Sequence, residues 1–229
     1  MFTSHLFYNA SRHSLMFLVK HTPSNTFIVK EVFIDEVGKM ATYQLSSSKV
    51  VPDMSKGYAY INFPNVNFVG ENIVYNYPVE SSIYMLDIRT NERKYILADS
   101  HYTSNIIEKC TTSGDYATLE KHWLENSHFY DIMYLPKYKI YARLHADKVD
   151  FDEIIGKKGM EKLINERDLY LMLFDENMEK IGETKLSNCR YSPFTSWNAT
   201  YGGIALFVDN VLDEKNNTDD LTIDIISLK

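Results

Sequence analysis

The chain has 229 residues, a formal net charge of −7 and a sequence pI near 5.5. Its hydrophobic content of 45% and charged content of 24% are typical of globular proteins, which excludes wholesale disorder. The acidic balance argues against nucleic-acid binding, because that function needs a basic surface. No apolar run approaches the ~18 residues of a membrane-spanning helix.

Aromatic residues make up 14% of the chain, and this content favours β-strands. Short segments rich in Tyr, Phe, Ile and Val alternate with turn-forming Asn, Asp, Ser, Gly and Pro, which is the pattern of strands and turns. In chain order, we expect strands at residues 6–9, 15–21, 27–34 and 40–45, then 67–69, 73–77, 83–88 and 93–97, then 129–135, 140–145, 169–174 and 181–186, and last 192–197, 204–208 and 221–228.

The first three groups share a turn between their third and fourth strands. In each, an apolar strand meets an aspartate (Asp35, Asp87 or Asp175), a short polar loop follows, and a basic residue opens the next strand. Aspartate suits such loops because its side chain bonds to nearby backbone groups. Two inserts interrupt the third unit: residues 99–126 are polar without strand alternation, and residues 147–167 have the apolar spacing of one or two short helices.

A four-strand unit that recurs every ~40–50 residues is typical of propeller blades. We therefore predict an all-β propeller of four-stranded antiparallel blades, with a short helical insert near 150–166; a β-sandwich is the alternative. We expect a single domain over residues 1–229, with about four blades at approximately 3–45, 59–97, 127–186 and 190–229. The last group has only three strands, so we expect an N-terminally incomplete ring that lacks a closing strand and up to two blades.

Several segments resemble an uncharacterised family of exported bacterial lipoproteins with a six-bladed, TolB-like β-propeller, a domain of unknown function. The likeness is carried by residues 134–143, 171–184, 203–207 and 226–229, and more weakly by residues 68–75. It covers most of this chain but only the C-terminal two-thirds of the family's length. The resemblance implies a lipid-anchored place in the cell envelope, in the periplasm or at the outer surface, and it supplies no activity and no functional residues.

The N-terminus of this chain has neither the basic region nor the long apolar region of a signal peptide. The sequence also lacks the nucleophile elbow, phosphate-binding loop, dinucleotide fingerprint and zinc-protease motif. Cys110 and Cys189 are 79 residues apart, which favours two free, buried thiols over a bridge or a zinc site. His128 and His145 flank strands of the third group, and we expect both to be half-exposed and hydrogen-bonded. We thus predict no catalytic residue, no cofactor and no metal.

The most suggestive constellation is Arg190, Tyr191, Trp197 and Asn198, around the inner strand of the last blade. Aromatic rings beside arginine and asparagine suit recognition of a glycan or a peptide. Core packing of Trp197 explains the same residues equally well.

The leading functional hypothesis is a non-catalytic ligand- or protein-binding propeller of the bacterial cell envelope. The alternative is a hydrolase or lyase with a site at the central channel, and a third possibility is a structural subunit whose ring a partner chain closes. A fold alone does not decide between these classes.

Overall fold

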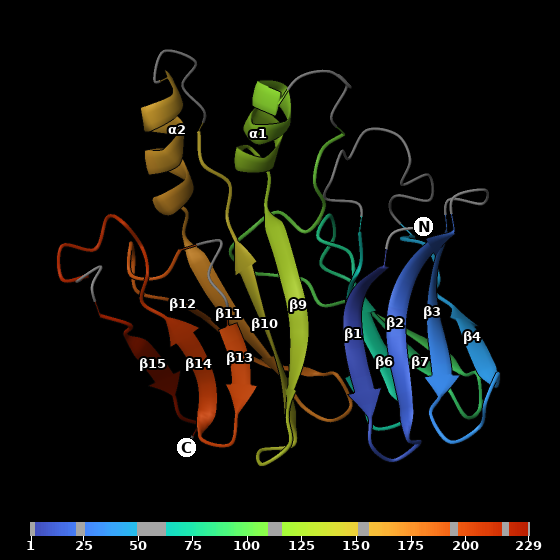
Figure 1. Cartoon of the computed structure of the whole chain (residues 1–229). Coiled ribbons are helices and arrows are strands. Elements are labelled where there is room, and N and C mark those ends of the chain that lie inside the picture. The colour runs from blue at the N-terminus through green and yellow to red at the C-terminus, as the bar shows by residue number, and fades with distance from the viewer. Residues whose placement is uncertain are drawn as a thin grey trace.

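The computed structural model describes residues 3–21, 26–49, 63–109, 116–150, 156–192, 197–216 and 220–228. Four antiparallel sheets are arranged as propeller blades, and their first strands follow one another around a common axis (Figure 1). The predicted fold class is confirmed.

Consecutive strands pair within every blade. Blade 1 contains β1 (Thr3–Asn9), β2 (Ser14–His21), β3 (Thr26–Phe33) and β4 (Met40–Gln44). Blade 2 contains β5 (Asn65–Val69), β6 (Asn72–Asn76), β7 (Ile83–Asp87) and β8 (Arg93–Ile96). Blade 3 contains β9 (His128–Leu135), β10 (Ile140–Ala146), β11 (Leu169–Phe174) and β12 (Lys180–Lys185). Blade 4 contains β13 (Trp197–Thr200), β14 (Gly203–Phe207) and β15 (Ile223–Ile226).

The first strand of blade 4 was expected at residues 192–197, of which residues 193–196 lie outside the described residues. Strand β13 begins at Trp197, which pairs with Leu206. Ser192 is held differently: its backbone N–H donates to the Asp209 side chain at 3.1 Å. A side-chain acceptor thus replaces a strand partner there, and this cannot be recognised from apolar spacing.

Two helices lie at one end of the propeller, opposite the β1–β2, β9–β10 and β13–β14 hairpins (Figure 1). Helix α2 (Gly156–Asn165) occurs in the predicted insert. Helix α1 (Tyr116–Leu124) was not predicted, because its segment carries few apolar residues. Its C-terminal end is fixed by the buried Arg167, whose guanidinium donates to the carbonyls of Trp123 at 3.2 Å and Asn126 at 2.6 Å. A cation there stabilises unpaired helix carbonyls.

The predicted aspartate turns form in two of three blades as expected. The Asp87 carboxylate accepts the backbone N–H groups of Arg89 and Thr90, each at 2.8 Å, and Asp175 accepts two N–H groups in the same way. Asp35 instead contacts the His13 ring. Each loop closes with a residue of positive φ, at Gly38, Asn91 and Met178.

Apolar side chains fill the three spaces between blades. One cluster joins blades 1 and 2, a second joins blades 2 and 3, and a third joins blades 3 and 4. The largest fully buried side chain is Arg143 of β10, between blades 2 and 3. Its guanidinium donates to the carbonyls of Ser81 at 2.6 Å and Ala98 at 2.9 Å, and lies over the rings of Phe129 and Phe174. This arginine therefore ties two blades together through backbone groups.

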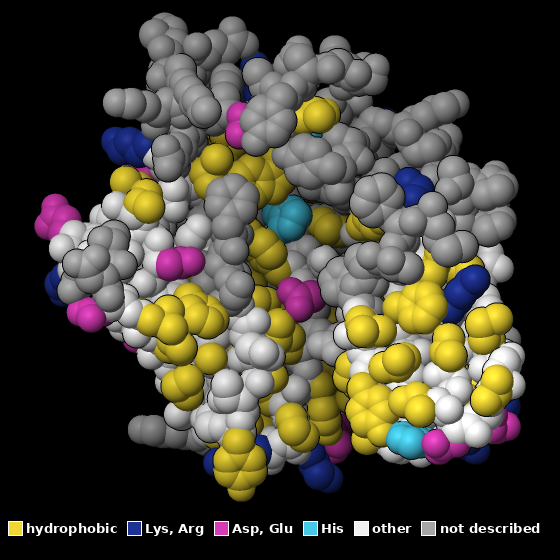
Figure 2. Space-filling view, in the orientation of Figure 1, with side chains coloured by type: hydrophobic (Ala, Val, Ile, Leu, Met, Phe, Trp, Pro, Cys, Tyr) yellow, Lys and Arg dark blue, Asp and Glu magenta, His cyan; other side chains and the backbone are white. Residues whose placement is uncertain are grey.

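The face of blade 1 that points away from blade 2 is apolar and open. Its exposed residues include Leu6 at 72%, Tyr8 at 48% and Met40 at 64%, and hydrophobic side chains gather over β1–β4 in Figure 2. On β15 of blade 4, Ile223 and Ile225 are 42% and 49% exposed. Exposed apolar patches of this kind mark interaction surfaces.

Within the part of the chain that the structure describes, neither helix has the length and apolarity needed to cross a membrane.

Candidate functional site

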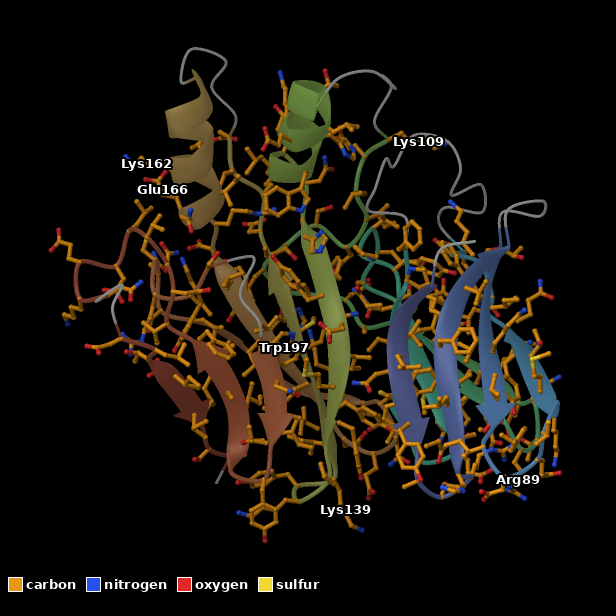
Figure 3. The ribbon with its side chains drawn as sticks, viewed as in Figure 1. Arg89, Lys109, Lys139, Lys162, Glu166 and Trp197 are labelled. Atoms are coloured by element: carbon orange, nitrogen blue, oxygen red, sulfur yellow. The ribbon has the colours of Figure 1, made fainter. Side chains whose placement is uncertain are left out.

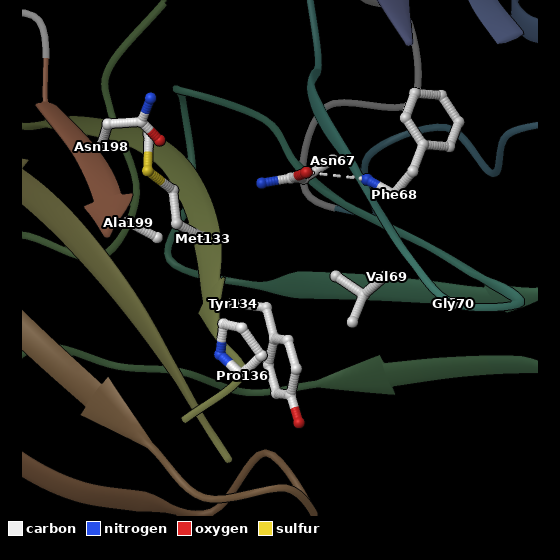
Figure 4. A pocket seen from close by; sticks show the side chains of 9 residues that line it. All are labelled: Asn67, Phe68, Val69, Gly70, Met133, Tyr134, Pro136, Asn198 and Ala199. Atoms are coloured by element: carbon white, nitrogen blue, oxygen red, sulfur yellow. Dashed lines mark hydrogen bonds between the residues drawn. The ribbon is translucent and has the colours of Figure 1, made fainter. Parts of the chain in front are cut away.

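A cavity of about 450 Å³ opens between the inner strands of blades 2, 3 and 4 (Figure 4). This volume lies within the range of pockets that bind small molecules. Its lining comes from residues 67–70 of β5 and the following turn, from Met133, Tyr134 and Pro136 of β9 and its hairpin, and from Asn198 and Ala199 of β13.

The cavity exists because three inner strands, far apart in the sequence, lie side by side. Strand β9 packs between β5 and β13. Gly70 occupies the first position of the two-residue turn between β5 and β6, with a φ of +60° that favours glycine. No heavy atom would lie within 4 Å of a Cβ added there. The turn thus leaves open space beside the pocket.

Asparagine side chains of β5 form hydrogen bonds to the backbone of β9 at the pocket wall. The Asn65 amide donates to the carbonyl of Phe129 at 3.1 Å, and the Asn67 amide donates to the carbonyl of Ile132 at 3.0 Å. The Asn67 oxygen also accepts the backbone N–H of Phe68 at 2.8 Å (Figure 4). Because these amides replace strand pairing between blades, Asn67 holds the pocket wall together and its amide is already engaged.

None of the lining residues that the structure describes is charged. Burial, and next the nearby Glu176, raise the pKa of Tyr134, so its phenol stays protonated at neutral pH. Asn198 is exposed, and among the described residues its amide has no hydrogen-bond partner. The site therefore offers an unengaged amide, a phenol that is hydrogen-bonded to Glu176, and apolar walls, which suit an uncharged ligand with hydrogen-bonding groups.

The structure places three of the four predicted binding residues outside the pocket, and Arg190 and Tyr191 are the first two of these. Arg190 donates through Nε and Nη2 to the Asp224 carboxylate at 2.6 and 2.9 Å, and the Tyr191 hydroxyl donates to the same carboxylate at 2.7 Å. Hydrogen bonding to Arg190 lowers the pKa of Asp224, and burial raises the pKa of Tyr191 to about 12. These interactions attach Arg190 and Tyr191 to β15.

The other two predicted residues lie on the inner strand β13. The Trp197 ring is 6% exposed, packs in the core between blades 3 and 4, and donates from Nε1 to Asp131 at 3.1 Å. Figure 3 shows Trp197 between the two ends of the propeller, with Lys139 at the hairpin end. Of the four residues only Asn198 lines the pocket. A binding role for the four stays a prediction.

Sequence reasoning missed the other eight described lining residues: Asn67, Phe68, Val69, Gly70, Met133, Tyr134, Pro136 and Ala199. Residues 68–70, Tyr134 and Pro136 lie in the segments that carry the family resemblance. One usable signal is position, because Gly70, Tyr134 and Pro136 lie at or next to the C-terminal end of an innermost strand of a predicted blade.

A second polar cluster lies between blades 2 and 3. The His145 ring is fully buried and stacks between Phe129 and Tyr170, which corrects the half-exposed position that we expected for it. Its Nε2 lies 3.0 Å from Glu183, and Thr103 lies 3.2 Å from Nδ1. The order of hydroxyl, imidazole and carboxylate resembles a catalytic arrangement. Since stacked rings cover His145, the cluster instead fastens the loop before α1 to blade 3.

This cluster predicts acid sensitivity. Burial lowers the pKa of His145, so the folded state holds it neutral; hydrogen bonds from His145 and its neighbours lower the pKa of Glu183 despite its burial. Both groups release protons more readily when folded, so each contributes stability at high pH. The histidine contribution should be lost as pH falls below ~6.5 and the carboxylate contribution below ~4.5.

The measurement is the free energy of unfolding by urea between pH 7 and 4. Plotted against pH, the free energy of unfolding of a His145→Phe variant should have a slope that is shallower than that of wild type. The difference should reach about 1.4 kcal/mol per pH unit, which corresponds to one proton. An unchanged slope between pH 6.5 and 4.5 would contradict the assignment, whatever the variant's absolute stability.

No group of three or more histidine, cysteine, aspartate or glutamate side chains suited to a metal ion occurs within the described ranges. Cys189 is a free, partly buried thiol. Cys110 lies outside the described residues, so its state stays a prediction.

Comparisons with known proteins show the fold alone. No protein-family model matches the sequence, and no curated protein matches it significantly. A member of the DUF4221 family from Bacteroides vulgatus superposes with a TM-score of 0.70 at 14% identity, over 96% of this chain. The chain spans 63% of that structure's length.

Another match is the β-propeller domain of the Trilobed protease from Pyrococcus furiosus, described as having an open velcro topology. It has a TM-score of 0.47 at 10% identity and covers 99% of this chain and 57% of its own. The likeness of fold rests on the DUF4221 family member, with its TM-score of 0.70.

Proposed function

We propose that this protein is a ligand-binding propeller whose site is the pocket between the inner strands of blades 2, 3 and 4. The single observation that carries the proposal is the convergence of three separate blades on one uncharged cavity of about 450 Å³. Propellers commonly bind ligands where loops of several blades meet, and the cavity opens beside the β5–β6, β9–β10 and β13–β14 turns. The ligand is a glycan or a peptide.

The test is a thermal-shift screen of soluble glycans and peptides, followed by titration of each hit into a blocked variant. Asn198→Trp should place an indole in the cavity and abolish binding, because Asn198 is exposed and its change leaves the core intact. Thr184→Trp is the matched control, an exposed strand residue of β12 outside the pocket, and should bind as wild type. Equal binding by both variants would overturn the proposed site.

We further propose that the ring has six blades. Support comes from the open apolar face of blade 1, which continues the alternation that packs its other face on blade 2, and from the exposed Ile223 and Ile225 at the opposite end. Edge strands that face water usually carry charges or proline, whereas β15 presents isoleucines. Two further four-stranded blades of a longer polypeptide would cover both faces.

The proposed location is the bacterial cell envelope, and its support is the resemblance to exported lipoproteins. Fractionation of cells that express the full-length gene tests it. Recovery with the membrane fraction and labelling by a fatty-acid probe is expected, and recovery with cytosolic markers would contradict it.

A further inference from the structure

The β13–β14 hairpin, which follows the β13 wall of the pocket and is called its rim below, carries an exposed aromatic ring. Tyr201 follows β13 directly, two residues after Ala199 of the pocket wall, and it is 81% exposed. Its ring is therefore accessible to a ligand, and aromatic rings on turns held by a rigid scaffold are common binding residues.

This ring is held in place by the neighbouring hairpin. The Lys137 ammonium lies 5.0 Å from the Tyr201 ring and 5.1 Å from the Tyr138 ring, while the Tyr138 hydroxyl donates to the carbonyl of Gly202 at 3.2 Å. Lys137 in turn follows Pro136 of the pocket lining. The cation and the hydrogen bond join the β9–β10 and β13–β14 hairpins, each of which follows a strand that lines the cavity.

From these observations we infer that the pocket and its rim bind an oligosaccharide, with one sugar ring against Tyr201 and another in the cavity. This inference rests on the proposed binding function and names its ligand class. A sugar presents hydroxyl groups at its edge and apolar C–H groups on its face. The unengaged Asn198 amide supplies both donors and an acceptor for the edge, and the Tyr201 ring supplies a flat apolar surface for the face.

The inner strands favour a sugar over an extended peptide. A peptide strand binds by pairing with an open strand edge, but the carbonyls of Phe129 and Ile132 on β9 already accept the amides of Asn65 and Asn67. Among the described lining residues none carries a charge, so the ionic groups of a peptide would meet counter-charges only at the edge of the site, at Lys137 and Glu176.

The test is isothermal titration with four hexasaccharides: maltohexaose, cellohexaose, xylohexaose and chitohexaose. At least one should bind the wild-type chain. Tyr201→Ala should weaken that binding about tenfold, equivalent to ~1.4 kcal/mol, whereas Tyr201→Phe keeps the ring and should bind as wild type. Tyr102→Ala is the control, since Tyr102 is 53% exposed but stacks on Tyr170 of blade 3. Circular dichroism melts verify that all variants fold.

The outcomes separate this inference from the function on which it rests. If no hexasaccharide binds but a peptide from the screen binds and is blocked by Asn198→Trp, the ligand class is wrong and the site stands. If neither a hexasaccharide nor a peptide binds, the sugar-binding inference and the proposed binding function are both overturned. Equal saccharide affinity in Tyr201→Ala and wild type would also overturn the role of the rim.

Discussion

Replacing Arg143 by alanine should lower the free energy of unfolding by ~3–5 kcal/mol, the range expected when a large buried side chain is removed and its hydrogen-bond partners are left unpaired. Arg143 is completely buried, and two backbone carbonyls, those of Ser81 and Ala98, depend on it. Both carbonyls lie in blade 2, whereas Arg143 belongs to blade 3, so the variant weakens a blade interface.

The charge of Arg143 is itself costly. Burial lowers the pKa of Arg143 to about 9, and within the described ranges no carboxylate is hydrogen-bonded to it. Arg143→Met, which fills the space without the charge, should therefore be less damaging than Arg143→Ala, since apolar replacements of buried charges recover much of the loss. Urea unfolding of both variants measures the difference. Arg89→Ala, in an exposed turn, is the control and should change stability by less than ~0.5 kcal/mol. Equal stability of Arg143→Ala and wild type would contradict this role.

Replacing Gly203 by alanine should destabilise blade 4 by ~3 kcal/mol or more, because a new atom would overlap backbone that cannot move independently. A Cβ on Gly203 would lie 2.0 Å from the carbonyl oxygen of Ile226 and 2.9 Å from its carbonyl carbon, and the residue has a φ of +145°. The clash falls where β14 pairs with β15, so the third strand of the blade must separate.

Gly182→Ala provides the comparison for Gly203. Gly182 lies within β12, and no heavy atom would come within 4 Å of its added Cβ. That change should cost little. Thermal melts followed by amide exchange of the β14 and β15 N–H groups are the measurement. A Gly203→Ala variant as stable as Gly182→Ala would show that blade 4 is packed differently.

Most strands could be predicted because each blade repeats a local pattern. Strand β3 alternates buried and partly buried residues, as its sequence indicates, and the aspartate turn before β8 is fixed by bonds within four residues. Helix α1 could not be predicted, since its end is stabilised by Arg167, more than 40 residues later. The residues of the helix itself do not indicate that a distant arginine binds its end.

The candidate site was predictable only in part for the same reason. Asn198 was identified from residue type on a predicted inner strand, and it does line the pocket. Its partners in the cavity, such as Gly70 and Met133, are 128 and 65 residues away in the chain and meet it only after three blades assemble. Arg190 and Tyr191 had suitable side chains, but Asp224 engages both.

The central claim is that ligand enters the cavity between blades 2, 3 and 4, and methyl NMR of the methionine-labelled chain tests it most directly. Met133 lines the cavity, Met16 and Met172 are fully buried elsewhere, and Met40 is exposed on the open face of blade 1. On addition of a hit from the ligand screen, the Met133 methyl signal should shift while those of Met16, Met172 and Met40 stay unchanged. A shift of Met40 with Met133 unchanged would contradict the account and place binding on the open blade face.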